Sequence, residues 1–259
     1  MRNMKFKIAA AIIFLSADGA YAQGPGDKSV PNQSAITSII ERHLSDGLKK
    51  YKAAAAGAVL IDAKTGKIIT SASIQAPGIE KRDIIKTGVF EFGHVAKIMT
   101  IAAGLESGVI TPKSKLDARQ PLKIGPYTID DKNPQRRILS SEEVAIYSSN
   151  IGAAKIGLKL GGPYQALFQR SLGMREKIEN GGEPIFAQNP KEVTVAANAF
   201  GHGFAVSPLH VVSAFATLTN PDGRLIRPSA NLNVRDAGLS IVSPETSAEI
   251  GKILRMNVE

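Results

Sequence analysis

The sequence predicts a mixed α and β fold, in which an early β-hairpin is followed by a run of helices. Residues 57–61 and 67–71 are rich in Val, Ile, Leu and Thr, and residues 62–66 between them form a turn that ends on Gly66. Helical spacing and helix-capping residues dominate the chain after the hairpin. Hydrophobic residues make up 43% of the 259 residues and charged residues 21%. The chain is therefore expected to fold as an α+β protein with a substantial core.

An amphipathic helix is predicted before the hairpin. Apolar residues recur at helical spacing from Ile36 to Tyr51. His43 lies among them and is expected at the edge of the core. A further helix is predicted over residues 94–106, because Ser107 and Gly108 supply a helix stop.

Capping residues define the later elements. Ser140 and Glu143 have the spacing of a capping box, which predicts a helix that runs toward Ser148. The helix that follows is expected to begin at Gly152 and to stop at the glycine pair 161–162.

Two serine-proline pairs, at 207–208 and 243–244, predict helix starts in the last part of the chain. The first opens a helix that runs to Leu218, and the second opens a last helix that runs to the chain end. A turn at residues 221–223 precedes a predicted short strand at residues 224–227.

The N-terminal residues have the three-part layout of a secretory signal. Residues 1–7 are basic, residues 8–17 are apolar, and Ala20 and Ala22 occupy the small positions that a signal peptidase reads. The apolar run, about ten residues long, is too short to cross a bilayer core of roughly 30 Å as a helix. The predicted organisation is a signal peptide at residues 1–22, a flexible leader at 23–34 and one domain at 35–259.

Composition excludes several classes of function. The chain has no cysteine, which rules out disulfides, thiol catalysis and cysteine-ligated zinc. Its formal charge is +9, but the basic residues are scattered and are not interleaved with aromatic residues. We therefore expect the charge to keep the protein in solution, and we expect no nucleic-acid partner. No later segment is apolar enough to span a membrane, so the mature protein is expected free of the membrane after export.

Three short motifs carry the clearest functional signal. Residues 91–97 read Glu-Phe-Gly-His-Val-Ala-Lys, residues 148–150 read Ser-Ser-Asn, and residues 200–209 are glycine-rich before a helix start. In this order they resemble the E-x-G-S-x-x-K, S-x-N and glycine-rich segments of class B penicillin-binding proteins, whose motifs serve serine acyl transfer. Residues 105–110 and 117–122 also resemble the intervening stretch of the septal, cell-division transpeptidases.

The resemblance implies the β-lactamase/transpeptidase-like fold, an antiparallel sheet flanked by helices. It also implies a third motif, K-T-G, after the last helix, and the sequence ends at Glu259 before one. The Lys-Thr-Gly stretches at 64–66 and 86–88 come too early in the chain to be this third motif. We therefore expect a C-terminally truncated transpeptidase domain, with mainly the helical part and an N-terminal hairpin.

The resemblance assigns four candidate catalytic positions: His94, Lys97, Ser148 and Asn150. In the family, the lysine activates a serine one helical turn away, and the second motif supplies a relay hydroxyl and a substrate-holding amide. His94 stands where that serine belongs. An acyl-imidazole is labile, and removal of a serine nucleophile costs about a million-fold in kcat in subtilisin.

The sequence therefore favours a periplasmic penicillin-binding-protein homologue without acyl transfer, which binds peptidoglycan stem peptides or proteins of the cell wall and division. An active transpeptidase or carboxypeptidase with His94 at the nucleophile position is the alternative. A truncated paralogue that folds poorly is a further one. In an inactive protein, Lys97, Ser148 and Asn150 would still hold two helices together through hydrogen bonds.

No cofactor and no metal are predicted. A metal site would require His94, His202 and His210 to converge, and their spacing fits no helix pair of the i, i+4 type. His202 is expected in a loop typical of the family. His210 is expected on the surface or in the core of a helix.

Overall fold

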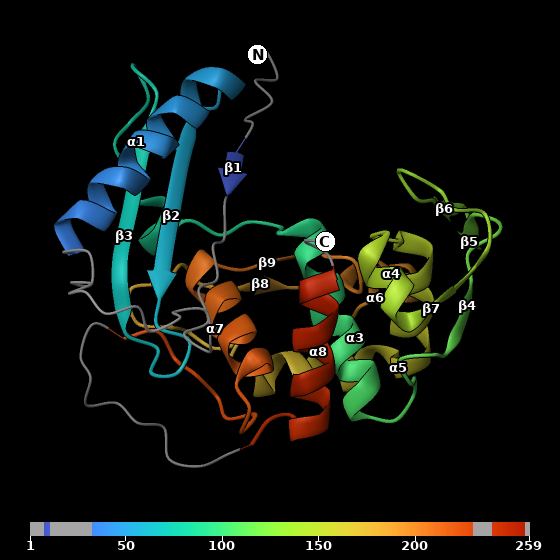
Figure 1. The fold of residues 1–259 in the computed structure, drawn as a ribbon. Helices are drawn as coiled ribbons and strands as arrows, with labels where there is room; N and C mark the ends of the chain where they lie inside the picture. The colour runs from blue at the N-terminus through green and yellow to red at the C-terminus, as the bar shows by residue number, and fades with distance from the viewer. Residues whose placement is uncertain (1–7, 11–32, 230–239, 257–259) are drawn as a thin grey trace.

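The computed structural model describes residues 8–10, 33–229 and 240–256 (Figure 1). The predicted hairpin is confirmed. Strand β2 (Ala55–Ile61) pairs antiparallel with β3 (Ile68–Gln75), and the short strand β1 (Ile8–Ala10) runs parallel along the other edge of β2. Gly66 has a φ of 74°, the left-handed conformation that the turn requires.

Helix α1 (Gln33–Tyr51) covers one face of the hairpin, and α7 (Pro208–Thr219) contacts the other (Figure 1). All of β2 is buried because its alternate side chains point to the two faces of the sheet, and a helix packs on each face. Ala56 and Ala58 pack with α1, whereas Val59 packs with α7. A hairpin that is marginal by itself thus gains two helical layers.

The buried stripe of α1 consists of residues four apart: Ile36 and Ile40 are half-buried, and Leu44 and Leu48 are buried. The prediction that His43 lies at the edge of the core is wrong, since its side chain is exposed. One residue turns a helix by about 100°, which takes His43 off the stripe that Leu44 defines.

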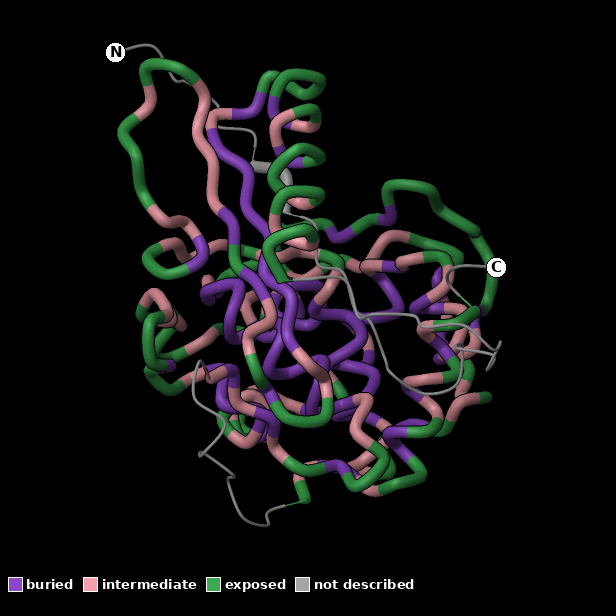
Figure 2. Tube along the Cα trace, turned by 60° about the vertical axis from the view of Figure 1, so that its left-hand side comes forward, coloured by how far each residue is buried: buried purple, intermediate pink, exposed green. Residues whose placement is uncertain are grey.

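The main core lies among four helices: α3 (Ala96–Glu106), α5 (Asn150–Ser171), α7 and α8 (Pro244–Met256). Every residue of α3 from Ala96 to Gly104 is buried. Figure 2 shows most of the buried segments gathered in the body of the molecule, and a further buried stretch in the hairpin, where all of β2 is buried. The α3 helix therefore has neighbours on all sides, which fixes the side chains that it carries.

The remaining elements are short, and three pairs of strands are antiparallel: β4 with β7, β5 with β6, and β8 with β9. The bounds are α2 (Ile84–Thr87), the 3₁₀ turn η1 (Gly93–Val95), β4 (Lys115–Asp117), β5 (Leu122–Ile124), β6 (Tyr127–Ile129), β7 (Ile138–Ser140), α4 (Ser141–Ile146), β8 (Ile185–Phe186), α6 (Glu192–Asn198) and β9 (Phe204–Ala205).

Several predicted boundaries are confirmed. The serine-proline pairs begin α7 and α8, and Gly108, with a φ of 70°, follows the end of α3. The predicted stop at the glycine pair 161–162 is an interruption: Gly161 has φ 75° and ψ 157°, and helical structure resumes to Ser171. Helix α5 also begins earlier than expected, at Asn150, because Ser149 caps it.

The strand predicted at residues 224–227 is wrong. Only Arg224 forms a bridge there, with Ser240. The backbone groups of Ile226 are instead satisfied by α7: its N–H donates to Thr217 Oγ1 at 2.9 Å, and its carbonyl accepts from Ser213 Oγ at 2.5 Å. Side chains thus replace the strand partner that this segment would otherwise need.

The predicted N-terminal organisation falls mostly outside the described residues. Of the predicted signal peptide at residues 1–22, only β1 is described, so the cleavage stays a prediction. The leader at 23–34 ends sooner than expected, because Gln33 and Ser34 already belong to α1. Among the described helices, none is long and apolar enough to cross a membrane.

The capping box of α4 is confirmed: Ser140 Oγ accepts from the Glu143 N–H at 3.1 Å, and Glu143 Oε2 accepts from the Ser140 N–H at 2.8 Å. Ser140→Ala is expected to lower the free energy of unfolding by about 1 kcal/mol, because one helix N–H loses its acceptor. Urea denaturation measures this. Ser38→Ala, which removes an exposed hydroxyl in the middle of α1, is the control, and an equal loss in both would contradict the capping role.

Candidate active site

Lys97 lies in the first turn of α3 and is only 2% exposed. Its Nζ donates to two atoms of one residue, the carbonyl oxygen of Ser148 and Ser148 Oγ, the latter at 2.9 Å. These contacts tie α3 to the junction of α4 and α5. The predicted network between the two motifs is therefore present for Lys97 and Ser148.

Ser148 takes this position through an uncommon backbone conformation. Its φ is 53°, in the left-handed region that residues other than glycine seldom adopt. The Ser148 N–H donates to the carbonyl of Ala145, and Ser149 begins the next helix by accepting from the Gly152 N–H at 2.9 Å. A tight connection between two helices thus directs both oxygens of Ser148 toward Lys97.

His94 lies in η1, one helical turn before Lys97, and its side chain is exposed. Its Nδ1 is 3.2 Å from Ser148 Oγ. Burial lowers the pKa of the His94 imidazole below its ordinary value. Electrostatic interactions with Lys97, His202 and Lys132 lower the same pKa further. His94 is thus mostly uncharged at neutral pH, and the ring nitrogen that carries no proton can then accept one.

Burial also lowers the pKa of the Lys97 ammonium, to about 8, and the negative charge of Asp131 opposes this shift. A lysine with this pKa is mostly protonated at pH 7 but close to its titration. The site therefore pairs a neutral imidazole with a weakly acidic ammonium, and both contact one hydroxyl.

Asp131 is a member of the site that the sequence analysis missed. It is 9% exposed, and its carboxylate accepts from Ser149 Oγ at 2.8 Å and from the Ile151 N–H at 3.0 Å. It therefore stabilises the start of α5. Its negative charge also raises the pKa of Lys97, against the effect of burial. No local signal marks Asp131, because its partners lie about 20 residues later in the chain.

Asn150 does not join the network of the other three candidates in the described structure. Its Nδ2 donates to the carbonyl of Asp130 at 2.9 Å. Its Oδ1 is buried and has no hydrogen-bond partner among the described residues. A buried acceptor without a donor is costly, so this atom is the unsatisfied polar group of the site.

The loop around His202 holds the segment that precedes His94. Glu91 Oε2 is 3.0 Å from His202 Nδ1, and Glu91 Oε1 accepts from the Gly203 N–H at 2.9 Å. The Gly93 N–H donates to the carbonyl of Gly201 at 3.2 Å. This pairing explains how the glycine-rich motif acts: its backbone fixes the turn that carries His94.

His210 lies in the core, which is one of the two positions expected for it on its helix. It is fully buried, and its nitrogens are occupied by Ser207, with Oγ at 2.7 Å, and by the carbonyl of Glu176, also at 2.7 Å. It therefore does not converge with His94 on a metal. In the part of the chain that the structure describes, no group of three or more His, Cys, Asp or Glu side chains could hold a metal ion.

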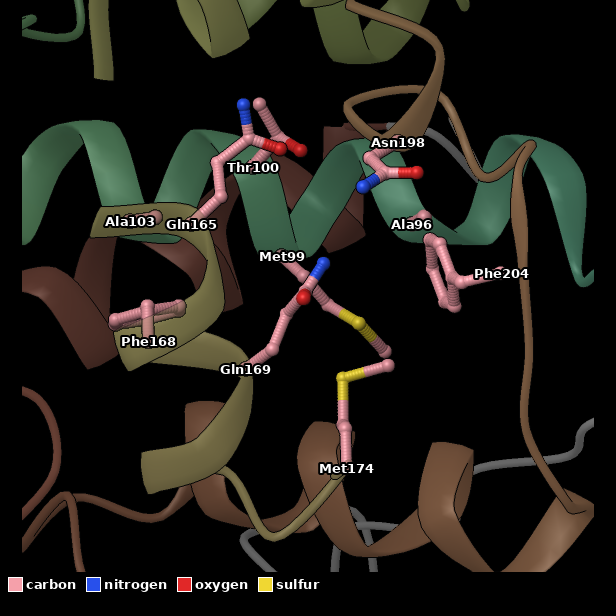
Figure 3. A pocket seen from close by; sticks show the side chains of 10 residues that line it. All are labelled: Ala96, Met99, Thr100, Ala103, Gln165, Phe168, Gln169, Met174, Asn198 and Phe204. Atoms are coloured by element: carbon pink, nitrogen blue, oxygen red, sulfur yellow. The ribbon is translucent and has the colours of Figure 1, made fainter. Parts of the chain in front are cut away.

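A small recess lies on another face of α3, between α3, α5, α6 and β9 (Figure 3). Ala96, Met99 and Thr100 line it from α3, and Met174 and Phe204 also line it. Figure 3 shows the side chains of Met99 and Met174 pointing toward each other. None of the four candidate site residues lines this recess, so it is separate from the polar site.

Residues 56–259 match the family model described as the penicillin binding protein transpeptidase domain. The chain belongs to this family. The match covers nearly all of the predicted domain and the hairpin, and it confirms the family that the ordered motifs predict.

The relatives are consistent with the class B assignment. The probable peptidoglycan D,D-transpeptidase FtsI of Caulobacter vibrioides is 30% identical over 93% of this chain and 44% of that protein. The probable peptidoglycan D,D-transpeptidase PenA of Neisseria flavescens is 26% identical over 87% of this chain and 62% of that protein. The chain thus spans less than two thirds of the length of either relative.

A solved structure supports the predicted fold. The transpeptidase domain of penicillin-binding protein 3 from Burkholderia pseudomallei aligns with a TM-score of 0.75 at 24% identity, over 91% of this chain and 72% of that chain. The β-lactamase/transpeptidase-like fold is therefore confirmed.

Proposed function

We propose that this protein is an exported, periplasmic member of the family that binds peptidoglycan stem peptides and does not catalyse transpeptidation through position 94. One observation carries the proposal: the side chain one turn before Lys97 is the imidazole of His94, which contacts Ser148 Oγ at 3.2 Å. The family reaction, as the motif resemblance implies it, needs an alcohol at that position to form a durable ester. The two relatives named above are described as peptidoglycan D,D-transpeptidases, which supports the choice of ligand.

The polar site supports peptide binding. Asn150 is half-buried next to the Asp130–Asp131 turn, and its Oδ1 has no donor among the described residues. A peptide N–H would satisfy this acceptor once the side chain turns toward the surface. The exposed imidazole of His94 leaves the adjoining surface open to a ligand. Proteins of the cell wall and division remain the other class of partner under this proposal, since a family member without catalysis can still bind them.

Asn150→Ala is expected to weaken binding of a stem pentapeptide roughly five- to ten-fold, the effect of one lost hydrogen bond in the range of 1–1.4 kcal/mol. Isothermal titration of the purified chain measures the Kd. Asn133→Ala is the matched control, because Asn133 is an exposed amide in the loop before Arg136. We expect it to bind as the unmodified protein does.

Assay of released D-Ala on the same samples tests the absence of transpeptidation. We expect binding without D-Ala release. Steady release that His94→Ala abolishes would refute the proposal and favour an enzyme that uses His94 directly. No binding of pentapeptide at concentrations up to the millimolar range would refute the peptide-binding part.

A further inference from the structure

We infer that Ser148 is a nucleophilic serine, with His94 as its base and Lys97 as the cation that stabilises its oxygen, and that it accepts groups from activated esters and phosphonyl donors. The inference concerns the same site as the proposed function but goes beyond it, because it holds whether or not the site binds stem peptides. Position 94 carries no alcohol, but Ser148 Oγ is 2.9 Å from Lys97 Nζ and supplies one to the same site.

The contacts of Ser148 Oγ determine the roles of its neighbours. An ammonium can only donate, so Lys97 Nζ donates to a lone pair of Oγ. The hydroxyl proton is then free to point toward His94 Nδ1 at 3.2 Å, which accepts it when the ring proton is on Nε2. The arrangement provides a base on one side of the hydroxyl and a positive charge on the other, which is the requirement for an activated nucleophile.

The backbone and the exposure of the pair support the same role. Ser148 has a φ of 53°, and strained residues of this kind cluster at functional sites. Its side chain is half-buried, and His94 is exposed, so a small electrophile can reach Oγ. Many exposed serines lack any adjacent base, as Ser38 does, whose hydroxyl donates to a helix carbonyl.

A second serine-histidine pair in the protein shows why access matters. Ser207 Oγ and His210 Nδ1 are 2.7 Å apart, closer than the pair formed by Ser148 and His94. Both residues are fully buried, and His210 Nε2 is held by the carbonyl of Glu176. This second pair is a helix cap enclosed in the core, and we expect it to be inert.

The reaction balances without any further component. With a fluorophosphonate, the Ser148 Oγ–H proton passes to His94 Nδ1, the Oγ–P bond forms, and fluoride leaves with the electrons of the P–F bond. With p-nitrophenyl acetate, the Oγ–C bond forms and p-nitrophenolate leaves with the electrons of the C–O bond, so that acetyl stays on Ser148. Neither leaving group needs a proton to depart, which is why we choose activated donors for the test.

The rate of labelling is expected to depend on pH at two points. It rises as His94 loses its proton, at a pH below the ordinary 6.5 of histidine, because burial and then Lys97, His202 and Lys132 lower that pKa. It falls near pH 8 as the Lys97 ammonium, which Asp131 faces, loses its proton. A bell-shaped profile between these limits follows from the two roles.

The test uses a fluorophosphonate probe on the full chain, followed by peptide mapping with mass spectrometry. We expect one label per molecule, on Ser148, and no label in Ser148→Gly. Glycine accepts a positive φ without strain, which offsets the hydrogen bond from Lys97 that the variant loses, so this variant should fold. His94→Ala should slow labelling about a hundred-fold, the lower range for loss of a general base. Ser38→Ala should label at the parent rate.

Three results would overturn the inference: a label mainly on another side chain, an unchanged rate in His94→Ala, or an unchanged rate in Ser148→Gly. Ser148→Ala serves as a second variant, because it keeps the backbone environment and removes only the hydroxyl. Pentapeptide titration is a separate measurement, so a protein that binds peptide without labelling would refute this inference alone. A protein that labels without binding peptide would refute only the proposed function.

Discussion

Asp131→Ala is expected to lower the free energy of unfolding by about 3 kcal/mol or more, one of the two largest effects predicted for single substitutions here. The carboxylate is 9% exposed and accepts from Ser149 Oγ and from the Ile151 N–H. Each hydrogen bond to a charged group contributes roughly 1.5–3 kcal/mol, and alanine would leave both buried donors without an acceptor. Urea denaturation followed by circular dichroism gives the difference.

Asp130→Ala is the matched control for this substitution. Asp130 precedes Asp131 directly, but its carboxylate is about two-fifths exposed and pairs with Arg136 at the surface. Exposed ion pairs contribute about 0–1 kcal/mol, and the Asp130 carboxylate also accepts from the Asp131 N–H at 2.8 Å. We therefore expect a loss clearly smaller than that of Asp131→Ala. Equal losses for the two aspartates would contradict the assignment. Asp131→Ala should also lower the pKa of Lys97 below about 8, because Asp131 opposes the shift that burial causes.

Gly201→Ala is expected to destabilise the protein by at least about 2 kcal/mol and to slow labelling of Ser148. Gly201 has a φ of 85°, and a Cβ atom there would lie 1.9 Å from the carbonyl oxygen of Gly93. A left-handed conformation alone costs a residue with a Cβ roughly 1–2 kcal/mol. The clash adds to this cost because the backbone of Gly93 cannot rotate away as a flexible side chain can. Labelling slows because the displaced turn carries His94.

Gly93→Ala separates the two parts of that cost. Gly93 has a φ of 54°, and a Cβ atom there would meet nothing within 4 Å. We therefore expect only the conformational cost of about 1–2 kcal/mol. Thermal melts of the two variants with the labelling assay provide the comparison. If Gly201→Ala unfolds no more readily than Gly93→Ala, the close approach of the two loops does not matter for stability.

The features that sequence predicted well depend on local patterns. The hairpin, the capping box of Ser140 and the proline-initiated helices each follow from residues a few positions apart, and the structure confirms them. The motif resemblance likewise identified Lys97 and Ser148, which the fold brings together from positions 51 residues apart.

The features that sequence missed depend on contacts distant in the chain. Asp131 resembles any acidic loop residue until α5 is placed beside it. The segment at 224–227 has strand-like residues, but hydroxyls of α7 bind its backbone first. The prediction for His43 was wrong because helical periodicity locates the buried face of a helix only to within about one residue. In the structure, the face that packs on the sheet contains Leu44 and not His43.

The double attachment of Lys97 to one residue has a consequence for how the protein would tolerate modification. The ammonium is held by the carbonyl oxygen of Ser148 as well as by its hydroxyl. A group added to the hydroxyl would remove one anchor and leave the other, because the carbonyl belongs to the main chain. The reactive atom, Oγ, is thus different from the carbonyl oxygen that keeps Lys97 attached to Ser148. A covalent adduct on Oγ would leave this link between α3 and the α4–α5 junction in place.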